Sequence, residues 1–393
     1  TITIDAITTH QTISGFGFSE AFQRAHALTN LPPPLQTQLL DLLFNTTTGA
    51  GFSILRIGLG SSPNSTLDHM NSPQPTADGP FAFDHNDSGQ LWVARQAHER
   101  YNITTFYADA WSAPGYMKTN GRDDMGGWLC GVRGAGQDPS DTNNNCQGAS
   151  WVQSYAEYLA RYVLAYIDAG IPISYVGFLN EPNLVKPYAT MLADGYQAAD
   201  IIAALYVALG GIGLPHVGIA CCEAQGWSYA REMLAELEDA GAVDGLSLMT
   251  THAYKGEPAA PDGPLGVTSM PVWITENSPI MQRLGMTETW YGNGSENEGL
   301  AWAVNIHEAI VRGNVSAYVY WIGTSGGSAT TGDGALPAYT IGATYWASAQ
   351  FSRFIRPGAK RIGVGQDWME GSVLVSAYEN KDGSVVVQAV NNG

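Results

Sequence analysis

Two short segments of the sequence are apolar runs that end in a glutamate. The first is Val176–Glu181, with Pro182 directly after it, and the second is Val272–Glu276. Each run is too short for a helix and has the composition of a buried strand. Catalytic residues of α/β barrels gather at the carboxyl ends of the strands. We therefore expect Glu181 and Glu276 to face each other across one substrate.

Two facing carboxylates perform a specific chemistry. Glycoside hydrolysis uses a pair of Asp or Glu residues that flank the scissile bond. Either glutamate alone is also compatible with a strand end that caps the following helix. Their occurrence together, at the fourth and seventh of eight predicted strands, favours catalysis. Asn180, beside Glu181, is suited to bind a sugar 2-hydroxyl in the transition state.

Aromatic residues follow the same predicted strands. Sugar rings have apolar faces, so tryptophans at a barrel mouth suit a saccharide, although core packing is the alternative for each of them. His252 and Tyr254 end the sixth strand, and either could keep Glu276 ionised by donating a hydrogen bond. Glu223 ends the fifth strand, where we expect it to form hydrogen bonds or orient the substrate rather than react. The aromatic positions are Trp111, Tyr116, Trp227, His252, Tyr254 and Trp321.

The spacing of the apolar runs predicts the fold. Eight short strands are separated by segments that include helical patterns at 151–169, 195–209 and 229–240. This alternation predicts an α/β fold, a (β/α)₈ TIM barrel. The predicted strands are Gly15–Ser19, Ile54–Leu59, Thr104–Ala110, Tyr175–Asn180, Val217–Cys222, Leu246–Thr251, Val272–Thr275 and Ala317–Ile322.

A smaller β domain is expected beside the barrel. Thr1–Ile13, Ser372–Tyr378 and Ser384–Val390 are strand-like, and the turn residues 380–383 predict a hairpin between the last two. We therefore assign residues 14–356 to the catalytic barrel, and residues 1–13 and 357–393 to a β-sandwich side domain. Little sequence follows the hairpin, so the side domain is expected to be incomplete at this end.

Composition excludes several partners and indicates a secreted protein. The 393 residues carry a formal net charge of −18, which disfavours nucleic acid and anionic membrane surfaces. An apolar run long enough to span a membrane is not found. Six glycosylation sequons and a start at Thr1 without an initiator Met favour secretion. The sequons begin at Asn45, Asn64, Asn86, Asn102, Asn293 and Asn314.

The four cysteines fall into two pairs. Cys130 and Cys146 bracket a Gly, Asp and Asn-rich segment, which predicts a disulfide in a secreted protein. Cys221 and Cys222 end an apolar strand, so we expect two small buried side chains there, with a strained vicinal disulfide as the alternative. The Cys and His spacing does not resemble a zinc site.

Motifs along nearly the whole chain resemble glycoside hydrolase family 30, and within it the fungal xylan-acting branch. Asn-Glu-Pro alone is shared by many barrels, but the complete set in this order is specific. The motifs are Gly15–Phe22, Leu55–Gly58, Trp111–Lys118, Asn180–Pro182, Trp273–Glu276 and Phe351–Gly358.

The resemblance implies a double displacement with retention of configuration. Glu181 then matches the acid/base, protonated at rest with a raised pKa, and Glu276 matches the nucleophile about 5–5.5 Å away. Arg24 resembles a position that contacts a substrate uronate, and a bidentate Arg suits a carboxylate. Further matches to sugar-binding positions are Arg56, Trp111, Asn180, Tyr254 and Trp321.

The expected substrate is glucuronoxylan, cut internally at a glucuronic acid branch or from a chain end with release of xylobiose. Neither a metal nor an organic cofactor is implied, and the chain is expected to be a monomer. The alternatives are a β-1,6-glucanase or a glucosylceramidase on the same barrel. A non-catalytic sugar-binding barrel is a further alternative, but binding alone requires neither Glu181 nor Glu276.

Overall fold

A computed structural model describes most of the chain. The described residues are 1–62, 70–85, 87–134, 145–256, 265, 270–279, 289–292, 298–324, 341–366 and 373–393. Asn64, Asn86 and Asn293 lie outside them. Of the other sequon positions, Asn102 and Asn314 are exposed and Asn45 is half-buried. Among the described residues, no helix combines the length and apolarity that a membrane span requires.

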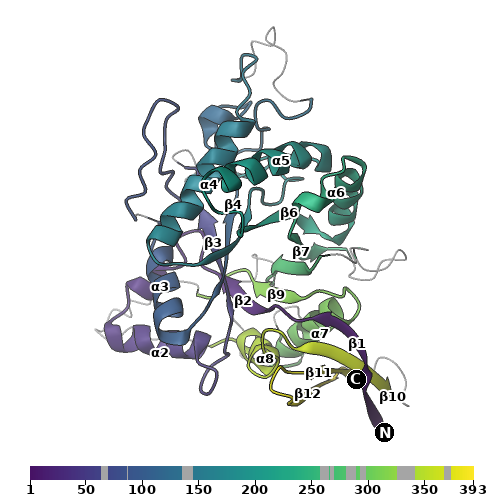
Figure 1. Ribbon diagram of the computed structural model, residues 1–393. Helices are drawn as coiled ribbons and strands as arrows, with labels where there is room; N and C mark the ends of the chain where they lie inside the picture. Colours follow the sequence, from purple (N-terminus) through teal and green to yellow (C-terminus); the bar gives the residue numbers. More distant parts are fainter. Residues whose placement is uncertain are drawn as a thin grey trace.

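Eight parallel strands form a closed barrel, as the sequence predicts (Figure 1). Each neighbouring pair runs parallel, and β9 closes the barrel against β2. The barrel strands are β2 Gly15–Ser19, β3 Ile54–Leu59, β4 Thr105–Ala110, β5 Ile173–Gly177, β6 Gly218–Gly226, β7 Leu248–Lys255, β8 Val272–Glu276 and β9 Ala317–Tyr320.

Helices surround the barrel and bury their apolar faces against it. Helix α5 begins with a capping box in which Asp194 and Gln197 bind each other's backbone N–H groups. The helices are α1 His26–Thr29, α2 Pro33–Phe44, α3 Gln90–Tyr101, α4 Val152–Asp168, α5 Gly195–Gly211, α6 Trp227–Asp239, α7 Gly299–Val311 and α8 Ala343–Ser352. Two 3₁₀ turns among the described residues are Gly115–Met117 and Val243–Gly245.

Several strand ends differ from the sequence prediction; β7, for example, runs to Lys255 instead of Thr251 and so includes His252 and Tyr254. Strand β5 stops at Gly177, so Asn180 and Glu181 lie on the loop after it. Glu181 has φ 46°, a left-handed conformation that an extended strand excludes. Strand β6 instead runs past Cys222 to Gly226, because its pairing with β7 continues through a register shift around Glu223.

The barrel interior is apolar at one end and polar at the other. Ile54, Tyr107 and Leu248 belong to a buried apolar cluster inside the barrel. Side chains two residues further along a strand point the same way, which places Arg56 and Asp109 inside the barrel as well. The polar end is therefore built on a rigid apolar layer.

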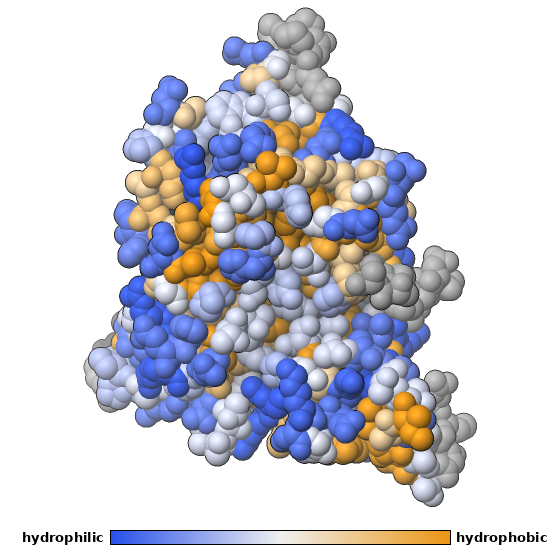
Figure 2. Space-filling view, viewed as in Figure 1, coloured by the Kyte–Doolittle hydropathy of each residue, from blue (hydrophilic) through white to orange (hydrophobic). Residues whose placement is uncertain are grey.

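Both ends of the chain form a second sheet. Its strand order is β1-β10-β11-β12, and its neighbouring strands are antiparallel. The sheet lies beside α7, with both termini near each other (Figure 1). Apolar side chains show on its surface (Figure 2), where Val385 and Val387 are 53% and 44% exposed. The strands are β1 Ile2–Thr12, β10 Lys360–Gln366, β11 Val373–Glu379 and β12 Val385–Asn391.

The structure contains two disulfides among the described residues. Cys130 and Cys146 are bonded, which confirms the predicted bridge. Cys221 and Cys222 are bonded to each other, so the expectation of two free buried thiols is wrong. Both side chains are buried as expected. The peptide between them is cis, which brings the two Cα atoms to 3.0 Å.

Replacing Gly17 by Ala tests the close approach of β2 and β3. A Cβ there would lie 2.0 Å from the Ile54 carbonyl oxygen, so the strand backbone would have to move. We expect a loss of about 3 kcal/mol or more in the free energy of unfolding. Gly210→Ala is the control, because nothing lies within 4 Å of its Cβ position, and Ala there should stabilise by up to about 1 kcal/mol. Equal urea midpoints for the two variants would contradict this packing.

Candidate active site

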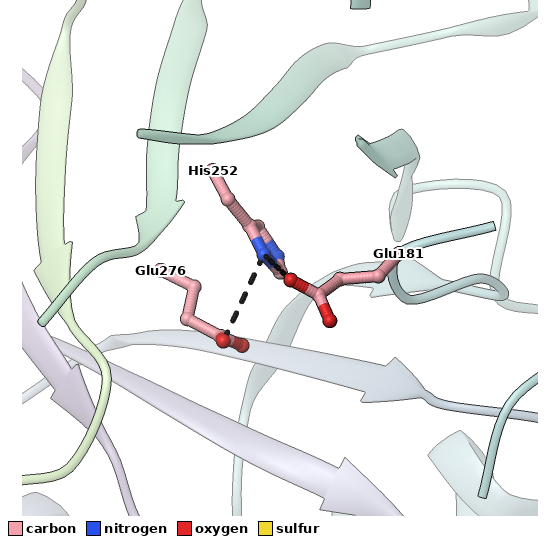
Figure 3. Close-up of side chains that lie close together, drawn as sticks. All are labelled: Glu181, His252 and Glu276. Atoms are coloured by element: carbon pink, nitrogen blue, oxygen red, sulfur yellow. Dashed lines mark ion pairs between the residues drawn. The ribbon is translucent and has the colours of Figure 1, made fainter. Parts of the chain in front are cut away.

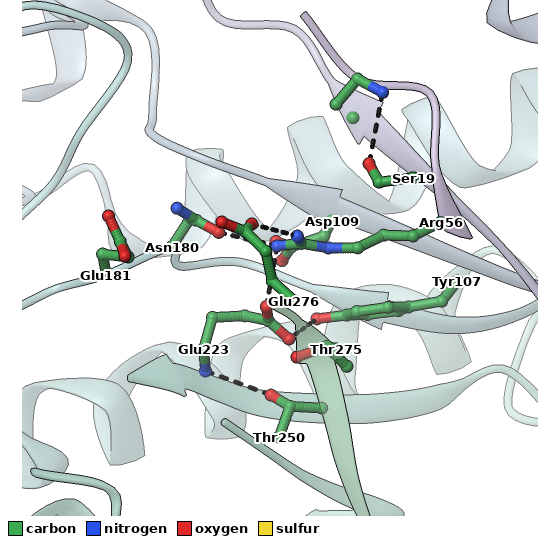
Figure 4. Close-up of polar contacts among 12 residues, drawn as sticks. Ser19, Arg56, Tyr107, Asp109, Asn180, Glu181, Glu223, Thr250, Thr275 and Glu276 are labelled. Atoms are coloured by element: carbon green, nitrogen blue, oxygen red, sulfur yellow. Dashed lines mark hydrogen bonds and ion pairs between the residues drawn. The ribbon is translucent and has the colours of Figure 1, made fainter. Parts of the chain in front are cut away.

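The guanidinium of Arg56 is the centre of the polar end of the barrel (Figure 4). Its side chain is fully buried on β3. Nη1 donates to Glu276 Oε2 at 2.5 Å, and Nη2 donates to Asp109 Oδ2 and Glu223 Oε2, each at 2.7 Å. Nη2 also lies 2.7 Å from Asn180 Oδ1. One cation therefore links β4, β6, β8 and the loop after β5. Arg56 was expected at a sugar-binding position, but its side chain is fully buried beneath the site.

Glu276, at the end of β8, is held by donors on both carboxylate oxygens. Arg56 binds Oε2, and the Tyr254 hydroxyl donates to Oε1 at 3.0 Å. Burial raises the pKa of Glu276, and the charges of His252 and Arg56 offset only part of this effect. Tyr254 therefore makes the contact with Glu276 that the sequence predicts for it or His252.

Glu181 faces Glu276 from the loop after β5. Its backbone N–H donates to the Glu223 carbonyl at 2.8 Å, and Tyr188 Oη donates to its Oε2 at 3.1 Å. Burial raises the pKa of Glu181, but His252 and Tyr188 outweigh burial and leave it below its usual value. The lowered pKa of Glu181 is opposite to the raised pKa that we expected. The reason is that His252 lies beside Glu181, a contact that the sequence does not reveal.

His252 lies between the two glutamates (Figure 3). Its Nδ1 is 3.5 Å from Glu181 Oε1 and 3.7 Å from Glu276 Oε1. Its Nε2 is 2.8 Å from Glu223 Oε2. Burial lowers the pKa of His252, but the surrounding carboxylates raise it to about 10. The carboxylates around the ring therefore favour its protonated form.

Glu223 is hydrogen-bonded to three of its neighbours. It accepts hydrogen bonds from Arg56, from His252 and, at 2.8 Å, from the Tyr107 hydroxyl. Burial opposes its ionisation, yet Arg56 and His252 lower the pKa of Glu223 to about 2. Its φ of 55° coincides with the register shift of β6. Glu223 therefore stays ionised and holds both cations in place.

The spacing of the glutamates limits the chemistry. One oxygen of Glu181, one nitrogen of His252 and one oxygen of Glu276 all lie within 4.8 Å of one another. Such a trio is also geometrically able to hold a metal ion. A protonated His252 and the Arg56 bond to Glu276 oppose that, because metal ligands must be deprotonated. With one oxygen from each glutamate inside this 4.8 Å limit, the two carboxyl groups lie closer than the gap of about 6.5–9.5 Å that an interposed water requires.

An aromatic wall borders the site. Trp111 follows β4, Trp321 follows β9, and their rings are 5.8 Å apart. Phe22 packs against both, at 5.2 and 5.1 Å, and against Tyr188 at 5.5 Å. Trp111 also stacks on the guanidinium of Arg56 at 4.3 Å. Phe22 itself has φ 58°, an uncommon conformation that is typical of functional sites.

Arg24 is on the same turn as Phe22. It is half-buried, and its Nε has no hydrogen-bond partner within the described part of the chain. Its charge acts on Glu20, a fully buried carboxylate at the end of β2. Burial raises the pKa of Glu20 to about 8, although Thr324 and Arg24 act in the opposite direction. Thr324 joins this turn to the loop after β9 by bonding Glu20 and the Arg24 carbonyl.

A buried lysine fixes the loop that carries Tyr188. Lys118 is fully buried, and its Nζ donates to Ser112 Oγ, the Asp123 carbonyl and the Thr190 carbonyl at 2.9, 3.1 and 2.5 Å. Burial lowers the pKa of Lys118 to about 7. It therefore ties the loop after β4 to the loop after β5, beside the Cys130–Cys146 bridge.

Several residues of the site were not predicted from the sequence. Tyr107 and Asp109 alternate along β4, so their common inward face was a detectable signal. Tyr188 and Phe22 lie on loops, where no periodicity indicates direction. Two predicted aromatic positions lie elsewhere: Trp227 is buried in the core at the start of α6, and Tyr116 packs on Trp151.

Family models match both parts of the chain. Residues 13–332 match the model of glycosyl hydrolase family 59, and residues 358–393 match that of the glycosyl hydrolase family 30 β-sandwich domain. The catalytic domain of family 30 xylanase C from Talaromyces cellulolyticus is 41% identical in sequence. That likeness covers 100% of this chain and 87% of the other, with a TM-score of 0.85. The likeness therefore includes both the barrel and the side sheet of this chain.

Curated relatives have more than one activity. An endo-1,6-β-D-glucanase of Trichoderma harzianum is 27% identical, over 97% of this chain and 78% of its own length. A glucuronoxylanase of Bacillus subtilis is 24% identical, over 61% of this chain and 52% of its own length.

Replacing Arg56 by Met tests whether its charge supports the site. The change leaves Glu223, Glu276 and Asp109 buried without their cation, which should cost about 3–5 kcal/mol of unfolding free energy. Arg122→Met is the control, since that side chain is 51% exposed in its pair with Asp124 and should cost less than about 1 kcal/mol. Similar losses in chemical denaturation would contradict the role of Arg56.

Proposed function

Since this chain belongs to glycoside hydrolase family 30 and to its xylan-acting branch, we propose that it hydrolyses the β-1,4-xylosidic bonds of glucuronoxylan with retention of configuration. The observation that carries the proposal is the approach of Glu181 to Glu276 within 4.8 Å at the polar end of the barrel. Inverting enzymes separate their carboxyl groups by about 6.5–9.5 Å to admit a water molecule.

In the proposed mechanism, Glu276 attacks the anomeric carbon. Arg56 and Tyr254 orient its carboxylate and leave one face directed at the substrate. Glu181 transfers a proton to the departing oxygen, and a covalent glycosyl–enzyme ester forms on Glu276. Water then enters, Glu181 removes its proton, and the ester is hydrolysed. Asn180 is held by Arg56 beside Glu181, where its amide suits the sugar 2-hydroxyl.

Two features support xylan as the substrate. The structure that is 41% identical to this chain, and similar to it over its whole length, is that of a xylanase. Arg24 lies on the turn that carries Phe22 of the aromatic wall, so its cationic group would be close to a sugar that bound against this wall. An acidic protein requires such a local cation to bind a uronate. We propose cleavage at uronate branches, release of xylobiose, or both.

A β-1,6-glucanase is the second candidate. The glucanase of Trichoderma harzianum is similar over 97% of this chain, a larger share than the glucuronoxylanase of Bacillus subtilis covers. The two glutamates and their cations would serve either substrate. The wall formed by Phe22, Trp111 and Trp321 is where the choice between xylose and glucose would be made.

The remaining expectations from the sequence stand as proposals. The protein is secreted and glycosylated, and it acts as a monomer on its polysaccharide without a cofactor. Of the described sequon positions, Asn102 and Asn314 are accessible to a glycosyltransferase. The catalytic barrel spans residues 14–356, and the side domain combines residues 1–13 with 357–393.

Replacing Glu276 by Gln tests the proposed reaction. We expect the loss of at least about 10³-fold in kcat on glucuronoxylan, because the nucleophile is removed. Mass spectrometry of the products should show xylobiose or aldouronic oligomers from the wild type and none from the variant. Glu232→Gln, an exposed change on α6, is the control. Products from β-1,6-glucan and none from xylan would establish the second candidate instead.

Replacing Arg24 by Ala tests uronate recognition. We expect kcat/KM on glucuronoxylan to fall by about tenfold or more, because a charge-assisted hydrogen bond is lost. Activity on linear xylo-oligosaccharides should change less than threefold (about 0.6 kcal/mol). Arg100→Ala, an exposed change, is the control. Equal losses on branched and linear substrates would contradict the proposed role of Arg24.

A further inference from the structure

We propose that His252 stores the proton that Glu181 delivers to the leaving group, so that the acid of this site is a His252–Glu181 pair. The inference rests on the proposed function. It assigns His252 a positioning and proton-storing role through Glu181, without contact to the substrate.

The geometry of the imidazole carries the proposal. His252 is fully buried on β7, and its two ring nitrogens have different surroundings. Nε2 is fixed by Glu223, which is itself bound to Arg56. Nδ1 has no hydrogen-bond partner in the described residues and points between Glu181 and Glu276 (Figure 3). A protonated Nδ1 is thus aimed at the site with a short path to Glu181 Oε1, 3.5 Å away.

The charges around His252 favour its protonated form. Glu181, Glu223 and Glu276 face the ring directly, and the buried Asp109 shares Nη2 of Arg56 with Glu223. The Tyr254 ring, which is neutral, packs at 5.7 Å. Arg56 and the imidazolium are therefore the cations among four buried carboxyl groups. The pKa of His252, raised to about 10, and the lowered pKa of Glu181 agree with this distribution.

This distribution leaves Glu181 without the proton that a general acid needs. The nearest proton available to it is the one on His252 Nδ1. When the glycosidic bond breaks, this proton moves to Glu181, and Glu181 passes the same proton on to the departing oxygen. The site then holds a neutral imidazole, an ionised Glu181 and an uncharged ester on Glu276. Total charge is unchanged, because one positive and one negative charge have disappeared together.

Formation of the ester also provides the driving force. The charge of Glu276 is the largest of the influences that raise the pKa of His252. Its loss in the ester lowers that pKa, which makes release of the proton favourable when the reaction demands it. In the second step, water gives a proton to Glu181, and His252 recovers it as Glu276 becomes ionised again.

Leaving-group dependence tests the proposal. His252→Gln should lower kcat/KM about 100-fold on phenyl β-xylobioside, whose leaving group needs a proton, and less than about fivefold on the 2,4-dinitrophenyl analogue. Glu181→Gln should show the same dependence. Tyr254→Phe is the matched control, because it keeps the ring that packs on His252 and removes the hydroxyl that bonds Glu276, and it should lower both rates equally. Equal losses on both substrates for His252→Gln would overturn the proposal.

Measurements on the wild type do not depend on the folding of a variant. In histidine-¹⁵N NMR at pH 7, both ring nitrogens of His252 should be protonated in the free enzyme. One should be deprotonated after trapping with a 2-fluoro-xylobioside. A neutral ring in the free enzyme, or an unchanged ring after trapping, would overturn the proposal. Failure of the wild type to hydrolyse any aryl xylobioside would instead overturn the proposed substrate, and the free-enzyme spectrum would still report on His252.

Discussion

The buried guanidinium of Arg56 is the constraint on which the site depends. Carboxylates removed from water are stable only when a cation and hydrogen bonds compensate their charge. Arg56 binds Glu276, Glu223 and Asp109 at 2.5–2.7 Å, and its planar fork fixes the directions of all three. The barrel makes these contacts possible, because Arg56 lies on β3 between the apolar cluster inside the barrel and the carboxyl ends of the strands.

The arrangement divides the carboxylates by role. Glu223 touches both Arg56 and His252 and remains ionised, so it holds the cations rather than reacting. Glu276 and Glu181 share the space beside His252, whose charge lowers the pKa of both carboxyl groups against the effect of burial. The proposed acid and nucleophile are therefore parts of one electrostatic unit. A change at any member is expected to alter the protonation of the others.

Much of the fold could be predicted from the sequence, because short apolar strands separated by helix-length segments have few solutions. Glu276 was placed correctly at the end of β8 for this reason. Asn180 and Glu181 were placed at the tip of a strand that stops earlier, since the left-handed backbone at Glu181 has no signature in a Glu-Pro sequence. Tyr188 was missed because loop paths follow from tertiary contacts such as those of Lys118. The partners of His252 depend on register shifts between β6, β7 and β8 that periodicity does not show.

The most direct test of the account is to identify the residue that bonds to the sugar. A 2-fluoro-xylobioside with a good leaving group should accumulate as a covalent ester, because fluorine slows both formation and hydrolysis of the ester while the good leaving group speeds formation alone. The account predicts that peptide mapping finds the label on Glu276 and that Glu276→Gln is not labelled. A label on Glu181 or Glu223, or turnover without any covalent adduct, would contradict it.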